Sequence, residues 1–236
     1  MSYFLSENNL SLGQPAVLKG PEADHILLSR RVKIDEQLAV QGPDGKRFIC
    51  DIQALGKHEV GLLPQQPLAT PPEPLVQVLL LQAVVGQNTL DLIFQKAVEL
   101  GAAKVILFNA AKTATRLSNE KFAAKLPRWQ KILWEAAKQC GRARVPELVF
   151  LPGFKEMLAA ASQLEKIFLM DSEGGHWPAG QEATTVGVII GPEGGLAAEE
   201  IAAAKQLPNC LPISLGPRLL RAETAAIAAL ALLGSL

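Results

Sequence analysis

A proline-rich segment in the first third of the chain most constrains how this sequence of 236 residues can fold. Residues 63–74 hold five prolines in twelve positions, and such a run can continue neither a helix nor a central strand. We therefore expect a linker at this point. It divides the chain into an N-terminal domain, residues 1–70, and a C-terminal domain, residues 71–236.

The N-terminal domain has the pattern of a small β-barrel or sheet. The pair Asp44-Gly45 lies between two apolar stretches and predicts a hairpin over residues 36–53. A third strand is expected over residues 59–63. Pro21, which acidic residues follow, predicts the start of a short helix.

The C-terminal domain alternates apolar runs with stretches of helical period. Strands are expected over residues 75–85, 105–108, 148–151, 167–170, 185–190 and 210–215. Helices are expected over residues 88–100, 119–139, 154–163, 197–206 and 222–233, and Pro127 would bend or divide the second of them. This alternation indicates an α/β fold with a mostly parallel sheet.

Several functional classes are disfavoured by the composition. Cys50, Cys140 and Cys210 lie far apart without a Cys-x-x-Cys pair, so we expect reduced thiols in a cytoplasmic protein and no metal site. The first residues lack a basic start followed by an apolar run, which argues against a signal peptide. The apolar stretches are too short to span a bilayer, so no membrane partner is expected.

The formal net charge of zero hides an uneven distribution. Residues 112–144 carry nine basic and two acidic side chains, whereas residues 151–236 carry five basic and nine acidic ones. A solvated helix face is the ordinary explanation of such a basic run. Beside the motifs described next, a surface for RNA phosphates explains it better.

The first motif is the glycine-rich loop Gly191-Pro192-Glu193-Gly194-Gly195, which follows an apolar strand and precedes a helix with an acidic start. Glycines let a ligand approach the backbone, and parallel α/β sheets bind ligands beyond the carboxyl ends of their strands. The spacing fits neither a P-loop nor a dinucleotide fingerprint. Because Glu193 would repel phosphate, a nucleoside without a phosphate chain is favoured, although a purely structural turn explains the pattern equally well.

The second motif is the segment Leu215-Gly216-Pro217-Arg218-Leu219-Leu220-Arg221-Ala222-Glu223-Thr224 before the last apolar helix. Helix capping and an Arg–Glu ion pair would explain Glu223 and Thr224. They do not explain why Arg218 and Arg221 occupy a tight loop beside so apolar a helix. The small alanines of that helix permit close approach of another element, including a second subunit.

Together, the two motifs resemble the signature of the RsmE family of SPOUT methyltransferases. Residues 91–101 resemble the first helix of the family's catalytic domain, residues 115–118 resemble its Arg–Ser loop, and residues 135–142 resemble its Ala–Gln–Arg helix end. Residues 25–31 and the Asp44-Gly45 hairpin resemble its PUA-like domain. The resemblance covers nearly the whole chain.

This resemblance implies a PUA-like RNA-binding β-barrel followed by a SPOUT domain, whose parallel sheet carries a deep trefoil knot. It implies a cytoplasmic homodimer that transfers a methyl group from S-adenosylmethionine to N3 of one uridine in 16S rRNA of the small ribosomal subunit. No metal is required. A related knotted enzyme that acts on another RNA or on ribose is the first alternative. A non-catalytic RNA-binding assembly factor is the second, which the intact loops disfavour.

The resemblance also implies the residues of the site. Those expected to bind S-adenosylmethionine are Leu169, Met170, Gly191, Pro192, Glu193, Gly194, Gly195, Leu215, Gly216, Leu219, Leu220, Arg221 and Thr224. The catalytic candidates are Arg221, Glu223 and, from the partner subunit, Arg116. Arginine would stabilise negative charge that develops on the base. Glu223 either accepts the N3 proton or orients Arg221, and both roles stay open.

RNA is expected to contact six arginines: Arg30, Arg31, Arg116, Arg128, Arg142 and Arg144. The target base must leave its stack to reach the site. Trp129, Trp134, Phe154 or an arginine plane would then stack on it. For the two tryptophans, packing in a helix core is the better expectation.

Overall fold

The computed structural model describes residues 3–178 and 183–234 and divides the chain into two compact units. The first comprises Met1–Pro72 together with Ala137–Arg144, and the second comprises Glu73–Ala136 together with Val145–Leu236. The chain therefore passes between the units at Pro72, inside the proline-rich segment. None of the sequence patterns described above predicts that residues 137–144 belong to the first unit.

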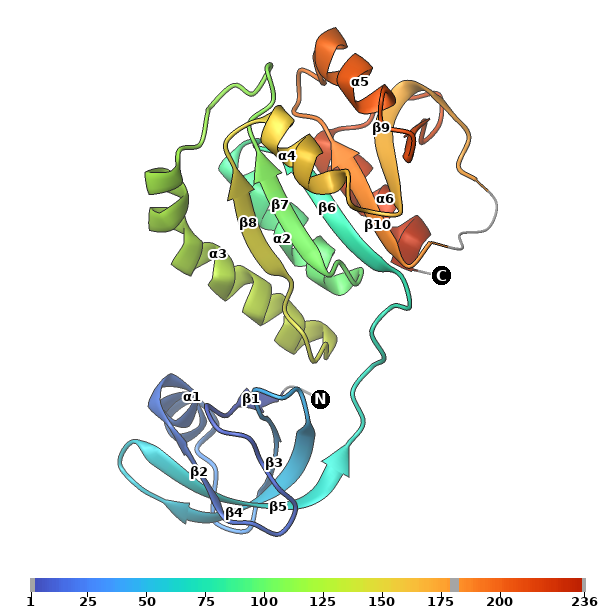
Figure 1. The fold of residues 1–236 in the computed structure, drawn as a ribbon. Coiled ribbons are helices and arrows are strands. Elements are labelled where there is room, and N and C mark those ends of the chain that lie inside the picture. The colour runs from blue at the N-terminus through green and yellow to red at the C-terminus, as the bar shows by residue number, and fades with distance from the viewer. Residues whose placement is uncertain (1–2, 179–182, 235–236) are drawn as a thin grey trace. The chain divides into compact units, whose positions relative to one another are not determined.

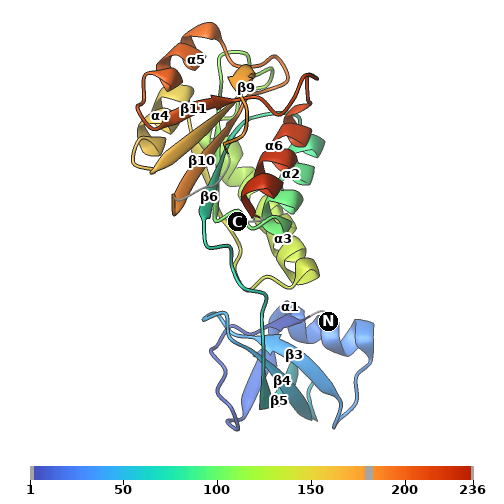
Figure 2. The ribbon, with the colours of Figure 1, turned by 90° about the vertical axis from the view of Figure 1, so that its right-hand side faces the viewer.

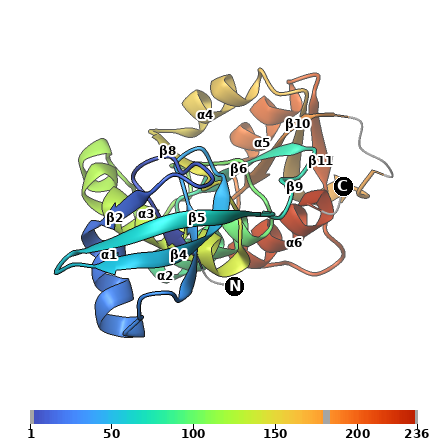
Figure 3. The ribbon, with the colours of Figure 1, turned by 90° about the horizontal axis from the view of Figure 1, so that it is seen from below.

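The first unit is built on a five-stranded sheet with the order β1-β3-β4-β5-β2. Its strands are β1 (Phe4–Leu5), β2 (Ala16–Lys19), β3 (Gln37–Gln41), β4 (Arg47–Leu55) and β5 (Glu59–Leu68). Helix α1 (Gly20–His25) continues into a π-helical turn (Ile26–Arg30), and Figure 3 shows the long strands β4 and β5 side by side. The predicted hairpin at Gly45 and the predicted short helix are confirmed.

The strand expected over residues 59–63 is shorter than the observed strand β5, which continues to Leu68 and contains two prolines. Strand β2 pairs with β5 only over residues 59–62. Beyond that point β5 has β4 as its neighbour, where Pro64 lies opposite Cys50 and Pro67 opposite Phe48. Proline is tolerated there because the open edge of a strand needs no N–H donor.

The second unit is an α/β fold with a six-stranded sheet in the order β11-β9-β10-β6-β7-β8 (Figure 1). The strands are β6 (Gln77–Ala83), β7 (Lys104–Phe108), β8 (Glu147–Leu151), β9 (Lys166–Gly175), β10 (Thr185–Ile190) and β11 (Cys210–Ile213). Every neighbouring pair is parallel, which confirms the predicted fold class.

Helices cover both faces of this sheet (Figure 2). On one face lie α2 (Gln87–Glu99), α3 (Asn119–Cys140) and α6 (Ala222–Gly234), and on the other lie α4 (Phe154–Ala161) and α5 (Ala198–Lys205). Helix α3 continues through Pro127, which therefore does not divide it. Trp129 of α3 is buried edge-on against Phe94 of α2, so its expected core packing is confirmed. Phe154 is likewise buried, whereas Trp134 is exposed.

Strand β9 leaves its regular register at the carboxyl edge of the sheet. Pro212 of β11 pairs with Leu169, but the next residue, Ile213, pairs with Gly175. Residues 170–174 of β9 therefore bulge between these two pairs, and Gly175 returns directly against β11. A Cβ atom on Gly174 would lie 2.5 Å from the backbone nitrogen of Ile213, so only glycine fits this crossing.

Candidate functional site

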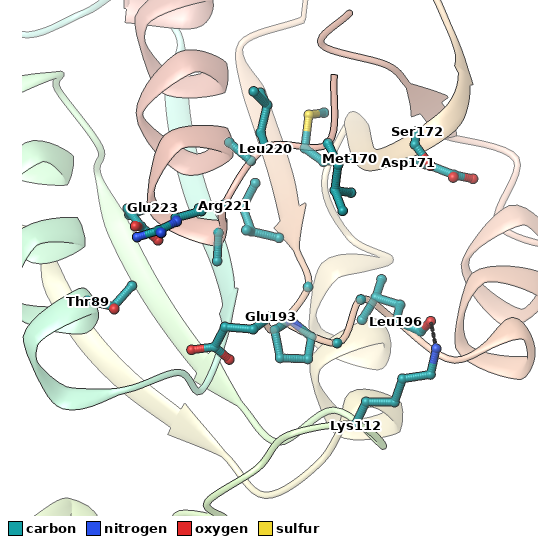
Figure 4. Close-up of a pocket in the computed structure, with 18 of the residues that line it drawn as sticks. Thr89, Lys112, Met170, Asp171, Ser172, Glu193, Leu196, Leu220, Arg221 and Glu223 are labelled. Atoms are coloured by element: carbon teal, nitrogen blue, oxygen red, sulfur yellow. Dashed lines mark hydrogen bonds between the residues drawn. The ribbon is translucent and has the colours of Figure 1, made fainter. Parts of the chain in front are cut away.

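A cavity of about 660 Å³ lies beyond the carboxyl ends of β9 and β10 and beside the first turns of α2 and α6 (Figure 4). Three segments form most of its wall. They are residues 170–172 of β9, the glycine-rich loop after β10 (residues 191–197), and the segment that enters α6. The residues lining it from these segments include Met170, Asp171, Ser172, Gly191, Pro192, Glu193, Gly194, Gly195, Leu196, Leu219, Leu220, Arg221 and Glu223.

The glycine-rich loop is a tight turn that brings its backbone to the cavity. Gly195 has a φ of +69°, which favours glycine, and its N–H donates to the carbonyl of Pro192 at 2.8 Å. The carboxylate of Glu193 accepts a hydrogen bond from the N–H of Gly86 at 3.3 Å. Because Gly86 is the residue before α2, Glu193 fastens the loop to the start of that helix.

A smaller recess of about 100 Å³ adjoins the cavity and shares Met170, Leu219 and Leu220 with it. The turn that closes the recess is held by Ser214, whose hydroxyl donates to the carbonyl of Gly216 at 3.1 Å. Gly216 has a φ of +114°, a conformation in which glycine is strongly preferred. The recess therefore extends the cavity along backbone and apolar side chains.

The other part of the cavity is polar. Arg221, Glu223, Thr89 and Glu193 all line it, and Figure 4 draws their side chains on the side of the cavity nearer to α2. An arginine, two carboxylates and a hydroxyl can bind a flat group that carries both hydrogen-bond donors and acceptors, such as the edge of a nucleobase.

Asp171 is held from outside the cavity. The ammonium group of Lys205 on α5 lies 3.0 Å from an Asp171 carboxylate oxygen, and the Asp171 side chain is 10% exposed. This ion pair fixes a carboxylate at the junction of the cavity and the recess, which Asp171 also lines.

Most of the expected cofactor-binding residues lie together, but three expected site residues do not line the cavity or the recess. Leu169 is fully buried in the hydrophobic core between the sheet and α4 and α5. Thr224 and Arg116 are exposed outside the lining. Leu215 and Gly216 line only the recess.

Asp171 and Ser172 belong to the loop after Met170, which the resemblance also implies for the cofactor site, whereas the sequence motifs missed Thr89 and Lys112. Asp171 and Ser172 directly follow the buried part of a parallel strand, which is a usable signal because such strand ends meet at one edge. Thr89 and Lys112 approach from the ends of β6 and β7. Nothing in their local sequence distinguishes them from ordinary loop residues.

The six arginines expected to contact RNA have different environments. Arg31, Arg116 and Arg144 are exposed. Arg128 forms a two-pronged pair with Asp91 at 2.8 and 2.6 Å, and this pair raises the pKa of Arg128. The side chain of Arg30 lies outside the described residues.

The expectation for Arg142 needs correction. Arg142 is only 7% exposed, so its side chain has little surface to offer a phosphate. Its backbone carbonyl accepts a hydrogen bond from the Tyr3 hydroxyl at 2.7 Å, within the first unit.

Within residues 3–178 and 183–234, no group of His, Cys, Asp or Glu is arranged to hold a metal ion. No helix in the same part of the chain is long and apolar enough to cross a membrane.

The chain is similar to known proteins over nearly its whole length. A family described as an RNA methyltransferase domain matches residues 71–234. The ribosomal RNA small subunit methyltransferase E of Bacillus subtilis is 29% identical over 223 residues, which cover 90% of this chain and 87% of the relative.

Two solved structures share the fold. A methyltransferase of Legionella pneumophila in complex with the cofactor SAM is 30% identical, with a TM-score of 0.86 over 99% of this chain and 96% of that one. The ribosomal RNA small subunit methyltransferase E of Neisseria gonorrhoeae, bound to S-adenosyl methionine, is 26% identical, with a TM-score of 0.87 over 100% of this chain and 97% of that one.

Proposed function

Because this chain belongs to the RsmE family of RNA methyltransferases, we propose that it transfers a methyl group from S-adenosylmethionine to N3 of one uridine in 16S rRNA. The observation that carries the proposal is the cavity at the carboxyl edge of the sheet. There the glycine-rich loop of residues 191–197, which we now call the cofactor loop, meets Arg221 and Glu223. Since ribosomal RNA is the proposed substrate, we assign the protein to the cytoplasm.

The cavity fits the proposed cofactor in size and chemistry. Its volume of about 660 Å³ falls within the roughly 300–1,000 Å³ of small-molecule sites. Gly191, Gly194 and Gly195 leave backbone groups open to a nucleoside, and Met170 and Leu220 provide apolar contact. When bound, S-adenosylmethionine supplies an electrophilic methyl group on a sulfonium. We assign its binding to these residues and to the turn at Leu215 and Gly216.

The polar end of the cavity suits the base. Uridine N3 carries a proton and becomes a good nucleophile only when that proton leaves. The guanidinium of Arg221 would stabilise the negative charge that then spreads over O2 and O4. Glu223 would either accept the proton or orient Arg221. Arg116 of the partner subunit would add a second positive charge.

We propose a homodimer as the active form. Its support is apolar surface on two neighbouring helices, where Leu92 of α2 and Leu232 of α6 are 38% and 44% exposed. Two copies of the cavity would then lie in one particle. Light scattering on the purified protein tests this, and a mass of one chain would contradict it.

We also propose that the second unit is a SPOUT domain with a trefoil knot and the first a PUA-like RNA-binding domain. The support for the knot is the close crossing of Gly174 and Ile213, together with a β11 that lies at the sheet edge while α6 returns to pack on β10 and β6. Exposed Arg31 and Arg144 support an RNA surface on the first unit.

Mass spectrometry of 16S rRNA nucleosides tests the function directly. Cells that lack the gene should lose N3-methyluridine from this RNA, and the wild-type gene should restore it. Unchanged N3-methyluridine in the deletion strain would contradict the proposed substrate. Failure of the purified protein to bind S-adenosylmethionine in calorimetry would contradict methyl transfer of any kind.

A further inference from the structure

Glu200 on α5 uses both of its carboxylate oxygens on backbone groups of two different loops. Its Oε2 accepts from the N–H of Ala197, the last residue of the cofactor loop, at 2.8 Å. Its Oε1 accepts from the N–H of Ala111, also at 2.8 Å. Ala111 belongs to residues 109–118 after β7, which we call the Arg116 loop. Hydrogen bonds to an ionised carboxylate are among the strong ones in proteins.

A second contact joins the same two loops. The Lys112 ammonium group donates to the carbonyl of Leu196 at 3.2 Å, which Figure 4 marks. A Cβ atom on Gly194 would lie only 3.3 Å from the Cβ of Lys112, so the two loops are also in close contact at this point. Lys112 also lines the cavity, which places the Arg116 loop at its wall.

The Arg116 loop is itself fixed as one piece by Asn109, which is buried. The Asn109 amide donates to the carbonyls of Leu117 and Pro152, and its oxygen accepts from the N–H of Leu117, each at 2.9 Å. These bonds join the two ends of the loop. Ala111 and Arg116 therefore lie within one closed turn of the chain.

We propose that Glu200 is a positioning residue that ties the Arg116 loop to the cofactor loop, so that binding of S-adenosylmethionine fixes where Arg116 lies. The glycines of the cofactor loop lose conformational freedom when a ligand binds. Glu200 transmits this ordering to the loop that carries Arg116. The inference deepens the proposed function and rests on it for the effect on methyl transfer.

The Glu200→Gln variant tests the tie. Glutamine has the same size, but it offers one acceptor oxygen and places an NH₂ donor where the second oxygen was. We expect that oxygen to keep the short-range bond to Ala197, so the bond to Ala111 is lost. Glu199→Gln is the matched control, because Glu199 is exposed in the same first turn and loses the same charge.

Two measurements on the full-length protein read the result. In steady-state kinetics, Glu200→Gln should lower kcat about tenfold, with the Kd of S-adenosylmethionine changed by less than about threefold. In hydrogen exchange, S-adenosylmethionine should slow exchange of residues 109–118 in the wild type and in Glu199→Gln. That slowing should disappear in Glu200→Gln.

Equal kcat values in the two variants would overturn the proposal, as would wild-type protection of residues 109–118 in Glu200→Gln. The exchange measurement keeps the two proposals separate. If the wild type transfers no methyl group, the proposed function fails, whereas cofactor-dependent protection through Glu200 is still tested by exchange.

Discussion

At the scale of single residues, one part of the cavity suits the cofactor and another part suits the base. Backbone and apolar groups around Gly195 and Leu220 suit a nucleoside cofactor, whereas Arg221, Glu223 and Glu193 suit the base. This separation means that one charged side chain can be changed without disturbing the surface assigned to the cofactor. Arg221 is the residue where that distinction matters most, because it stands between the two.

We expect Arg221→Ala to lower kcat about 10²–10³-fold, because a preorganised positive charge is worth most where negative charge develops. The Kd of S-adenosylmethionine should rise by a smaller factor, because Arg221 is also expected among the residues that bind the cofactor while the remaining lining is intact. Single-turnover methylation of rRNA and calorimetry measure the two quantities. Arg221→Lys keeps the positive charge but not the paired N–H donors of the guanidinium, so it should recover part of the rate. Full turnover in Arg221→Ala would remove Arg221 from the mechanism.

At the scale of elements, the alternation of strands and helices is predictable from hydrophobic period, and the two glycine motifs are predictable from spacing. The excursion of β9 is not, because its cause lies in β11, some forty residues later in the chain. The contact of Gly174 with Ile213 has no local signal. Lys112 and Thr89 are equally unpredictable from local sequence, because only the order of the strands brings them to the cavity.

The Gly174→Ala variant tests the crossing of β9 and β11. The added methyl group would meet the Ile213 backbone at 2.5 Å, so we expect a loss of about 3 kcal/mol in the free energy of unfolding. Urea denaturation measures the loss. Gly175→Ala is the control, because the nearest atom to its Cβ lies at 3.9 Å. Equal stability of the two variants would contradict so close a crossing.

At the scale of the whole molecule, the first unit is completed by a segment distant in sequence. Arg47 is buried with its guanidinium 3.6 Å from the Tyr3 ring centre, and it donates to Gln41 and to the carbonyl of Gly141. Burial raises the pKa of Tyr3 and lowers that of Arg47. Gln41 donates to the carbonyl of Ala143 at 3.0 Å.

Removal of these contacts of Arg47 and Tyr3, which anchor residues 137–144, should destabilise the first unit. Arg47→Met leaves the Gly141 carbonyl and the Gln41 oxygen without their donor, so we expect a loss of about 2–3 kcal/mol. Tyr3→Phe removes a single hydrogen bond, to the Arg142 carbonyl, and should cost about 1 kcal/mol. Thermal or urea unfolding of the full-length protein measures both. A smaller loss for Arg47→Met than for Tyr3→Phe would contradict the anchor.

The strand order has a consequence for how the protein is made. Strand β10 lies between β9 and β6, so the sheet lacks an inner strand until residue 190 has left the ribosome. The first unit likewise waits for residues 137–144, which are synthesised after α2, β7 and much of α3. Before residue 144 emerges, both units are therefore incomplete at the same time, and the nascent chain exposes apolar surface of both.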